Sequence, residues 1–243
     1  MGNSPLIISE KQIMPVKLLL VDDDPDLLYT LEKYLQQAGY ATVIANNGKS
    51  AINIFETEKP EAALIDVMMP ELDGFEVVKK IRSISTIPII LLTARSDETD
   101  KIVGLELGAD DYVTKPFSPR EVVARLKAIM RRGNQNQQEN TSKITIGKIT
   151  ADKNTRSVMR DNTSIQLTKT EFDILVTLME SPEQVFTRDQ IIDRVLGYTY
   201  EGFERTIDAH VRNLRKKIEP DANDPVYIKT VFGVGYKIEY LGK

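Results

Sequence analysis

The first half of the chain alternates short apolar runs with segments of helical periodicity, and this alternation constrains the fold more than any other feature. Segments such as Asp26–Gln37 and Ala51–Glu58 have the helical spacing. Runs that are apolar throughout, separated by helices, indicate a parallel sheet covered on both faces. We expect a doubly wound, five-stranded α/β domain with strands at Leu18–Val21, Ala41–Ala45, Ala62–Ile65, Ile87–Leu92 and Tyr112–Val113.

A polar segment divides the chain in two. Residues Gly133–Ser142 carry no apolar side chain, which is typical of a flexible linker. A chain of 243 residues has room for two domains of ordinary size. We expect a loose extension at 1–14, the α/β domain at 15–132, the linker at 133–142 and a second domain at 143–243.

The second half predicts a smaller α+β domain. Capping boxes formed by Thr168 with Glu171, and by Thr187 with Gln190, open two helices. A third helix runs from about Phe203 to Ile218. The segment Phe232–Gly235 predicts a glycine-turned hairpin. Further strands are expected at Ile144–Thr150, Ser157–Arg160 and Ser164–Leu167, with a turn at Asp161–Asn162, and the hairpin strands at Tyr227–Val231 and Tyr236–Tyr240.

Composition limits the chemistry and the location. The chain has no cysteine and one histidine, which excludes disulfides, thiolate metal sites and multi-histidine sites. No apolar run approaches the roughly 18–20 residues that span a bilayer. The N-terminus lacks the basic start of a signal peptide, and Leu6 breaks the myristoylation pattern. We expect a cytoplasmic protein.

Net charge gives no general indication of nucleic-acid binding. The formal charge is −4; residues 1–132 hold 16 Lys and Arg against 20 Asp and Glu, and residues 133–243 hold 16 against 16. Any prediction of DNA binding must therefore depend on local patterning.

Acidic residues gather where two of the expected strands end. Asp22, Asp23 and Asp24 follow the first strand, and Asp66 follows the third. Carboxyl ends of parallel strands form the ligand crevice of an open α/β sheet. Converging carboxylates need a cation, and a partly enclosed oxygen site suits Mg²⁺. Thr93 and Lys115 end the fourth and fifth strands and supply a hydroxyl and an ammonium, groups expected around a phosphoryl group. For Asp24 and Asp26 a role as helix caps is the simpler interpretation.

The motifs VDDD, LIDVMMP, LLTA and DDYVTKPF make residues 16–132 resemble the flavodoxin-like receiver domain of two-component response regulators. The resemblance implies that Asp66 is the phosphoacceptor and attacks the phosphohistidine of a partner kinase. It implies Mg²⁺ ligands at Asp22, Asp23 and the backbone carbonyl of Met68. Lys115 would contact the phosphoryl group and form a cis bond to Pro116, while Thr93 and Tyr112 would act as switch residues.

The third helix of the second domain has two distinct faces. At 100° per residue, one narrow face carries Ile207, Val211, Leu214 and Ile218. The opposite face carries Arg205, Ala209, Arg212 and Lys216, with Arg215 to one side. A recognition helix in a major groove needs basic side chains and no central bulk. For an isolated helix, the alternative is an ordinary solvated face.

The motifs LTKTEFDIL, ERTIDAHVRNLRKKIE and KTVFGVGYKI make residues 144–240 resemble the winged-helix effector domain of the OmpR/PhoB family. The family usually has arginine before the first wing glycine, whereas this chain has Phe232, which puts minor-groove reading by the wing in doubt. The resemblance implies DNA contacts from Arg205, His210, Arg212, Arg215 and Lys216, with Thr230 and Tyr236 near phosphates.

Coupling between the domains is expected to work through a receiver homodimer, because a flexible linker cannot transmit a rigid-body signal. Two tethered effectors would then bind tandem or paired half-sites in promoter DNA, gaining affinity from effective concentration, with RNA polymerase as a further partner. In the resembling subfamily, intersubunit salt bridges involve residues equivalent to Lys101, Asp110, Asp111, Glu121 and Arg125.

Three alternatives compete with a phosphorylation-activated transcription regulator. A phosphatase with an aspartyl-phosphate would need an acid two residues after Asp66, where Met68 stands. An output domain that binds a protein instead of DNA remains open. So does a receiver that switches by partner binding alone, although the full set of carboxylates with Thr93 and Lys115 argues against it.

Overall fold

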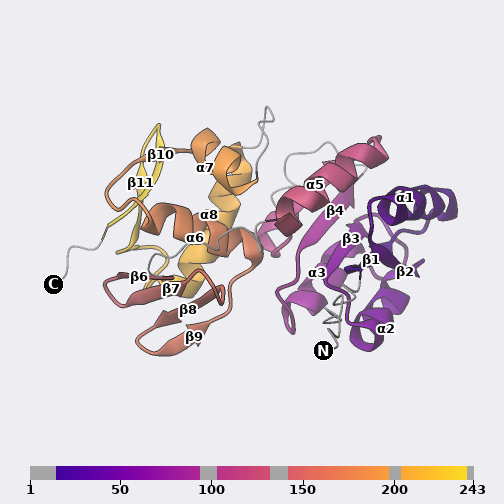
Figure 1. Cartoon of the computed structure of the whole chain (residues 1–243), viewed down its shortest axis with the longest axis horizontal. Helices are drawn as coiled ribbons and strands as arrows, with labels where there is room; N and C mark the ends of the chain where they lie inside the picture. The colour runs from indigo at the N-terminus through magenta and orange to yellow at the C-terminus, as the bar shows by residue number, and fades with distance from the viewer. Residues whose placement is uncertain (1–14, 94–102, 132–141, 197–203, 240–243) are drawn as a thin grey trace, which may run out of the picture.

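The computed structural model describes residues 15–93, 103–131, 142–196 and 204–239, which form two domains (Figure 1). Of the predicted linker only Ser142 falls within these ranges, and the predicted N-terminal extension lies outside them. The first domain contains the predicted parallel sheet, in the order β2-β1-β3-β4-β5. Its strands are β1 (Lys17–Val21), β2 (Ala41–Ala45), β3 (Ala62–Asp66), β4 (Ile89–Thr93) and β5 (Asp111–Thr114).

Among the described residues, four of the helices cover the two faces of this sheet. Helices α1 (Pro25–Gln37) and α5 (Pro119–Arg131) lie on one face, and α2 (Gly48–Glu58) and α3 (Gly74–Arg82) on the other (Figure 1). Alternate residues of β1 serve the two cores: Leu18 and Leu20 pack with α1 and α5, while Leu19 packs with α2 and α3. Two buried faces explain why the strands are apolar throughout.

Local chemistry fixes where elements of this domain begin. The carboxylate of Asp24 accepts hydrogen bonds from the backbone nitrogens of Asp26 and Leu27, which confirms the predicted cap of α1. Strand β4 begins at Ile89, so the prediction of Ile87 was wrong by two residues. Pro88 precedes it and has no N–H for the ladder, which explains the later start.

The second domain opens with an antiparallel sheet of four strands, β6 (Lys143–Ile146), β7 (Ile149–Asp152), β8 (Ser157–Arg160) and β9 (Thr163–Ile165). The prediction of one strand from Ile144 to Thr150 was wrong. The chain reverses at Gly147, whose φ of 57° lies in the left-handed region, and β6 pairs with β7. Asp161 and Asn162 form the predicted turn, with φ of 49° and 65°. Strand β9 ends at Ile165, two residues before the predicted Leu167.

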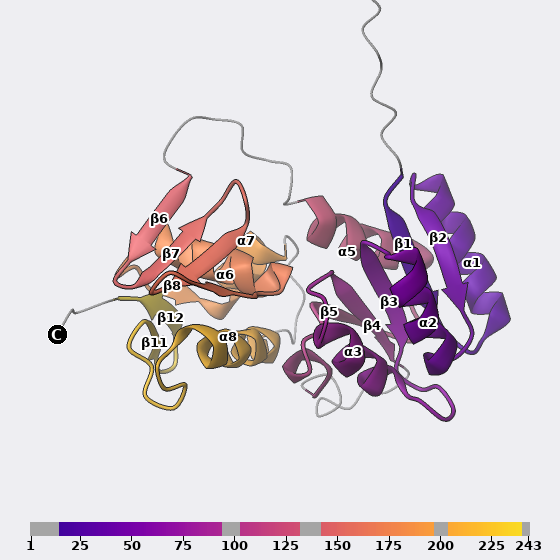
Figure 2. The same cartoon turned by 90° about the horizontal axis from the view of Figure 1, so that it is seen from below.

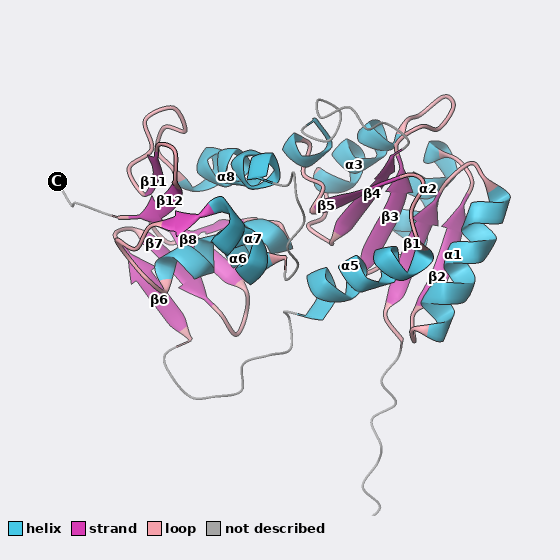
Figure 3. Ribbon diagram, turned by 90° about the horizontal axis from the view of Figure 1, so that it is seen from above, coloured by secondary structure: helices cyan, strands magenta, loops and turns pink. Residues whose placement is uncertain are grey.

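Three helices and a wing complete this domain (Figures 2 and 3). Both predicted capping boxes are present, at the starts of α6 (Lys169–Met179) and α7 (Arg188–Val195). Helix α8 (Glu204–Ile218) follows. The wing strands β11 (Ile228–Val231) and β12 (Gly235–Ile238) are shorter than predicted, and the two-residue strand β10 (Phe186–Thr187) pairs with β12. A Cβ at Gly235 would lie 2.0 Å from the carbonyl oxygen of Phe186, so this close pairing requires glycine.

Candidate functional site

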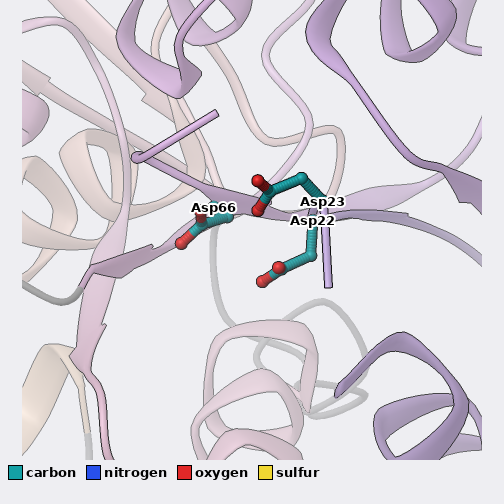
Figure 4. Close-up of side chains that lie close together, drawn as sticks. All are labelled: Asp22, Asp23 and Asp66. Carbon is teal, nitrogen blue, oxygen red and sulfur yellow. The ribbon is translucent and has the colours of Figure 1, made fainter. Parts of the chain in front are cut away.

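Three carboxylates converge at one edge of the parallel sheet. Asp22 and Asp23 directly follow β1, and Asp66 ends the neighbouring β3. One oxygen from each lies within 4.8 Å of the other two (Figure 4). Asp22 and Asp66 are buried, whereas Asp23 is exposed. The strand pairing therefore produces the acidic cluster that the sequence predicts.

Lys115 links two of these carboxylates from the end of β5. Its Nζ lies 2.8 Å from Asp22 Oδ2 and 2.9 Å from Asp66 Oδ1. Its backbone nitrogen donates to the carbonyl of Thr93, and its bond to Pro116 is cis, as predicted. One ammonium thus faces two buried carboxylates, and the third carboxylate leaves the cluster with excess negative charge.

The pKa values of these groups reflect that excess. Burial raises the pKa of the Asp66 carboxyl, and the charges of Asp22 and Asp23 raise it further, while Lys115 opposes the shift. Burial alone would lower the pKa of Lys115, but its hydrogen bonds to Asp22 and Asp66 raise it above its ordinary value. The ionised carboxylate of Asp66 is therefore disfavoured in the metal-free protein.

The remaining predicted residues surround Asp66. Thr93 ends β4 and Tyr112 lies in β5; their exposed fractions are 3% and 7%. The backbone nitrogen of Met68 donates to Asp66 Oδ2 at 3.1 Å, and the side chain of Met68 is exposed. At Gly74 a Cβ would lie 2.2 Å from the carbonyl oxygen of Asp66, so glycine allows α3 to begin against the site.

This donor set fits a hard divalent cation. Three carboxylate oxygens within 4.8 Å of one another are close enough to be shared by one ion after small side-chain adjustments, and oxygen ligands are those that Mg²⁺ prefers. The exposed position of Asp23 leaves one side open to water and to a phosphoryl oxygen.

Helix α8 has the predicted apolar stripe. Ile207, Val211, Leu214 and Ile218 are all fully buried. On the opposite face, Arg212 and Lys216 are exposed, while the side chain of Arg205 lies outside the described residues. Ala209 and His210 are 3% and 2% exposed, because the first domain covers this part of the helix. The predicted DNA-facing side is thus only partly open.

Three other predicted contact residues take part in the packing between α8 and the wing. Arg215 donates to the carbonyl oxygen of Ile228 and to Thr230 Oγ1. The hydroxyl of Tyr236 donates to Asp208 Oδ1 at 2.7 Å. Burial and this hydrogen bond raise the pKa of Tyr236 to about 12. These bonds fix the angle between the helix and the wing.

The comparisons with known proteins agree with this geometry. The response regulator receiver domain family matches residues 18–127, and the C-terminal domain family of transcriptional regulatory proteins matches residues 162–238. The alkaline phosphatase synthesis transcriptional regulatory protein PhoP of Bacillus subtilis is 42% identical over 234 residues, 93% of this chain and 98% of the relative. The DNA-binding response regulator MtrA of Mycolicibacterium smegmatis is 41% identical over 224 residues, 92% and 97% of the two chains.

The chain belongs to the OmpR/PhoB family of two-component response regulators.

A solved structure covers both domains of this response regulator. DrrB, an OmpR/PhoB homolog from Thermotoga maritima, is 34% identical and covers 93% of this chain and 100% of its own, with a TM-score of 0.50. The predicted fold class is confirmed, as is a transcription regulator with a receiver and a DNA-binding domain. None of the described helices is long and apolar enough to cross a membrane.

The residues predicted for the dimer face of the response regulator are paired within one chain. Arg125 bonds to Asp111 and Glu121, while Asp110 pairs with Arg82. Lys101 lies outside the described residues. Their role between two subunits stays a prediction.

Sequence reasoning missed the contacts between the two domains of the response regulator. Asp110, Thr170 and Asn213 all take part in hydrogen bonds that cross from one domain to the other. Their spacing follows no local period, so only a three-dimensional arrangement could identify them.

Proposed function

We propose that Asp66 of this response regulator is the phosphoacceptor. The observation that carries the proposal is the convergence of Asp22, Asp23 and Asp66 at the sheet edge with Lys115 between two of them. A carboxylate oxygen of Asp66 would attack the phosphorus of a histidine kinase's phosphohistidine. The P–O bond forms as the P–N bond breaks, and the electron pair stays with the imidazole.

Mg²⁺ would be held by Asp22, Asp23, Asp66 and the backbone carbonyl of Met68, and when bound it neutralises charge on the phosphoryl oxygens. Lys115, whose Nζ lies 2.9 Å from Asp66 Oδ1, provides a fixed positive charge for the oxygens of the transferred phosphoryl group. The self-phosphorylation and self-dephosphorylation at Asp66 are the only chemistry we assign to the protein.

Thr93 and Tyr112 would change position when Asp66 is phosphorylated and so alter the receiver surface. Both lie on the strands that end beside Asp66, and both are buried. A hydroxyl near the new phosphoryl group can donate a hydrogen bond to it, and the ring of Tyr112 would move inward as Thr93 shifts. This switch is carried over from the receiver family.

The output is promoter binding by a phosphorylated homodimer in the cytoplasm, with RNA polymerase as a downstream partner. The proposed dimer face comprises Lys101, Asp110, Asp111, Glu121 and Arg125. The proposed DNA contacts are Arg205, His210, Arg212, Arg215 and Lys216 in α8, with Thr230 and Tyr236 near phosphates.

The test compares wild type, Asp66→Asn and Asp26→Asn with a small-molecule phosphodonor and Mg²⁺. Asp26 is a matched control because it is an exposed carboxylate in the first turn of α1, outside the cluster. Intact-protein mass spectrometry should show one hydroxylamine-labile phosphoryl group on wild type and Asp26→Asn, and none on Asp66→Asn. Modification of Asp66→Asn to the same extent would refute the assignment.

A gel shift with promoter fragments then tests the output. Phosphorylated wild type should bind, with weaker binding by Asp66→Asn. Failure to bind DNA at low salt, with or without beryllofluoride, would favour the alternative of an output domain that binds an acidic protein surface.

A further inference from the structure

The tip of the wing exposes an aromatic side chain. Phe232 follows β11 and is 91% exposed, and Val234, just before β12, is exposed as well. The backbone nitrogen of Val234 donates to the carbonyl oxygen of Val231 at 3.0 Å, and Gly233 has a φ of 74°. A Cβ added to Gly233 would have no described heavy atom within 4 Å apart from its chain neighbours. This tight turn therefore holds Phe232 at the end of the hairpin, away from the rest of the described domain.

The base of the wing is fixed against α8. The guanidinium of Arg215 donates to the carbonyl oxygen of Ile228 at 2.6 Å and to Thr230 Oγ1 at 2.9 Å. The ring centre of Tyr236 lies 5.2 Å from Cζ of Arg188 and 5.6 Å from Cζ of Arg215. Phe232 is thus presented at a set position relative to α8, so a contact made by its ring costs little ordering of the backbone.

The charges near the wing favour DNA as the partner of this ring. Residues 227–238 include two lysines and no acidic residue, so no carboxylate of the hairpin repels phosphates. The neighbouring α8 carries the exposed Arg212 and Lys216, which attract the same phosphates. Lys237 is paired with Glu183 at 3.1 Å, which leaves the wing itself with little charge to contribute. The contact expected from the tip is therefore apolar.

A phenyl ring cannot read the minor groove by hydrogen bonding. The edges of A·T pairs present acceptors there, and the ring has no donor for them. Apolar side chains in the minor groove act instead as wedges, which enter between two base pairs, partly unstack them and bend the duplex. Unstacking is easiest at the flexible pyrimidine–purine steps TA, CA and TG. An arginine at the same place would favour the narrow minor groove of an A-tract.

We propose that Phe232 is a specificity-determining residue, which inserts between two base pairs of a pyrimidine–purine step in the minor groove beside the DNA that α8 contacts. This inference goes beyond the proposed function and rests on its DNA-binding part. The ring exchanges water for contact with base and sugar carbons, which offsets the loss of stacking. The protein then selects DNA by its deformability, at a step where the ring forms no hydrogen bond.

The test begins with selection from a random duplex pool by the full chain, in the presence of beryllofluoride and Mg²⁺. Wild type is compared with Phe232→Ala, Phe232→Arg and Met159→Ala. Met159 is a matched control, because it is an exposed apolar residue of the same domain that lies in β8, in the other sheet. Circular dichroism establishes that all four proteins are folded.

The selected sequences give the first readout. Sites selected by wild type and by Met159→Ala should contain a TA, CA or TG step at a fixed distance from the bases common to all sites. Phe232→Ala should select the common bases without that step, and Phe232→Arg should select an A-tract in its place. Selection of the same step by Phe232→Ala would overturn this inference and leave DNA binding intact. Failure of wild type to select any site would overturn both.

Affinities for two matched duplexes give the second readout. One duplex carries a selected site, and the other differs only in that the pyrimidine–purine step is replaced by AA. Wild type should bind the altered duplex about tenfold more weakly, whereas Phe232→Ala should bind the two duplexes equally. Equal binding of the two duplexes by wild type would contradict the proposal.

Insertion itself can be followed with 2-aminopurine placed in the selected step, because its fluorescence rises when the base loses its stacking. Saturation with wild type or Met159→Ala should raise the fluorescence, and saturation with Phe232→Ala should leave it unchanged. A bound wild-type complex with unchanged fluorescence would overturn the insertion and indicate that Phe232 contacts a protein instead of DNA.

Discussion

Replacing Asp66 with asparagine should stabilise the metal-free receiver, although Asp66 is the residue on which the proposed function depends. The variant keeps the shape of the side chain and removes one of three converging negative charges. Burial and the neighbouring carboxylates raise the pKa of Asp66, so its ionised form opposes folding. The uncharged asparagine should therefore increase the free energy of unfolding.

The magnitude follows from the distances. At an effective dielectric constant of about 20, two unit charges at the 4.8 Å that bounds the cluster repel by about 3.5 kcal/mol, so two neighbouring carboxylates cost Asp66 at least about 7 kcal/mol. The attraction between Asp66 and Lys115, at 2.9 Å, offsets about 6 kcal/mol of this repulsion. The net penalty is about 1 kcal/mol, and burial adds to it. For domains of this size, such a change raises the melting temperature by about 3–6 °C.

Differential scanning calorimetry at neutral pH in a chelator measures the effect, with the receiver transition identified as the one that moves with Mg²⁺. Added Mg²⁺ should stabilise wild type and should stabilise Asp66→Asn much less. Asp26→Asn, the exposed control, should show no increase in stability. The difference between wild type and Asp66→Asn should fade as pH falls toward about 4, because a carboxyl with a raised folded-state pKa opposes folding only when ionised. A lower melting temperature for Asp66→Asn at neutral pH without metal would refute this reasoning.

Three further predictions concern the effector domain. Glu219→Gln should lower its unfolding free energy by about 1–3 kcal/mol in calorimetry, because the carboxylate accepts from the backbone nitrogens of Val226, Tyr227 and Ile228. Phe232→Arg should change the unfolding free energy by less than about 0.5 kcal/mol, since Phe232 is 91% exposed. The same variant should bind DNA with a steeper dependence on salt concentration, by the amount expected of about one added phosphate contact. An unchanged salt dependence would show that the wing does not contact DNA.

Acidification should destabilise the protein through His210. Burial lowers the pKa of its ring, against the opposing influence of Asp110, Glu171 and Asp111, so the folded protein favours the neutral ring and loses stability as pH falls below about 6.5. In calorimetry the melting temperature of wild type should fall between about pH 7.5 and 5.5 by more than that of His210→Gln.

Much of the fold could be predicted because its determinants are local. The strands of the receiver are apolar on both faces, and the capping boxes at Thr168 and Thr187 mark helix starts within four residues of sequence. The largest error arose where the chain reverses inside a predicted strand, because nothing in Ile144–Thr150 except Gly147 indicates two strands. Strand β10 was missed because two residues show no period.

The acidic site was predictable for a geometric reason. Parallel strands bring their carboxyl ends to one edge, so residues far apart in sequence, such as Asp22, Asp66 and Lys115, must converge there. No comparable rule relates Asp110 to Thr170, which donates a hydrogen bond to it, or Glu106 to Arg212, with which it forms an ion pair. Their contacts depend on how two separately folded domains pack, and the burial of His210 follows from that packing alone.

Genome-wide footprinting in the native host, with wild type beside Asp66→Asn expressed at equal levels, tests most directly the claim that phosphorylation of Asp66 controls DNA binding. Under conditions that activate the kinase, wild type should protect discrete promoter sites made of tandem or paired half-sites, and Asp66→Asn should lose most of that protection. Identical footprints for the two proteins would contradict the account.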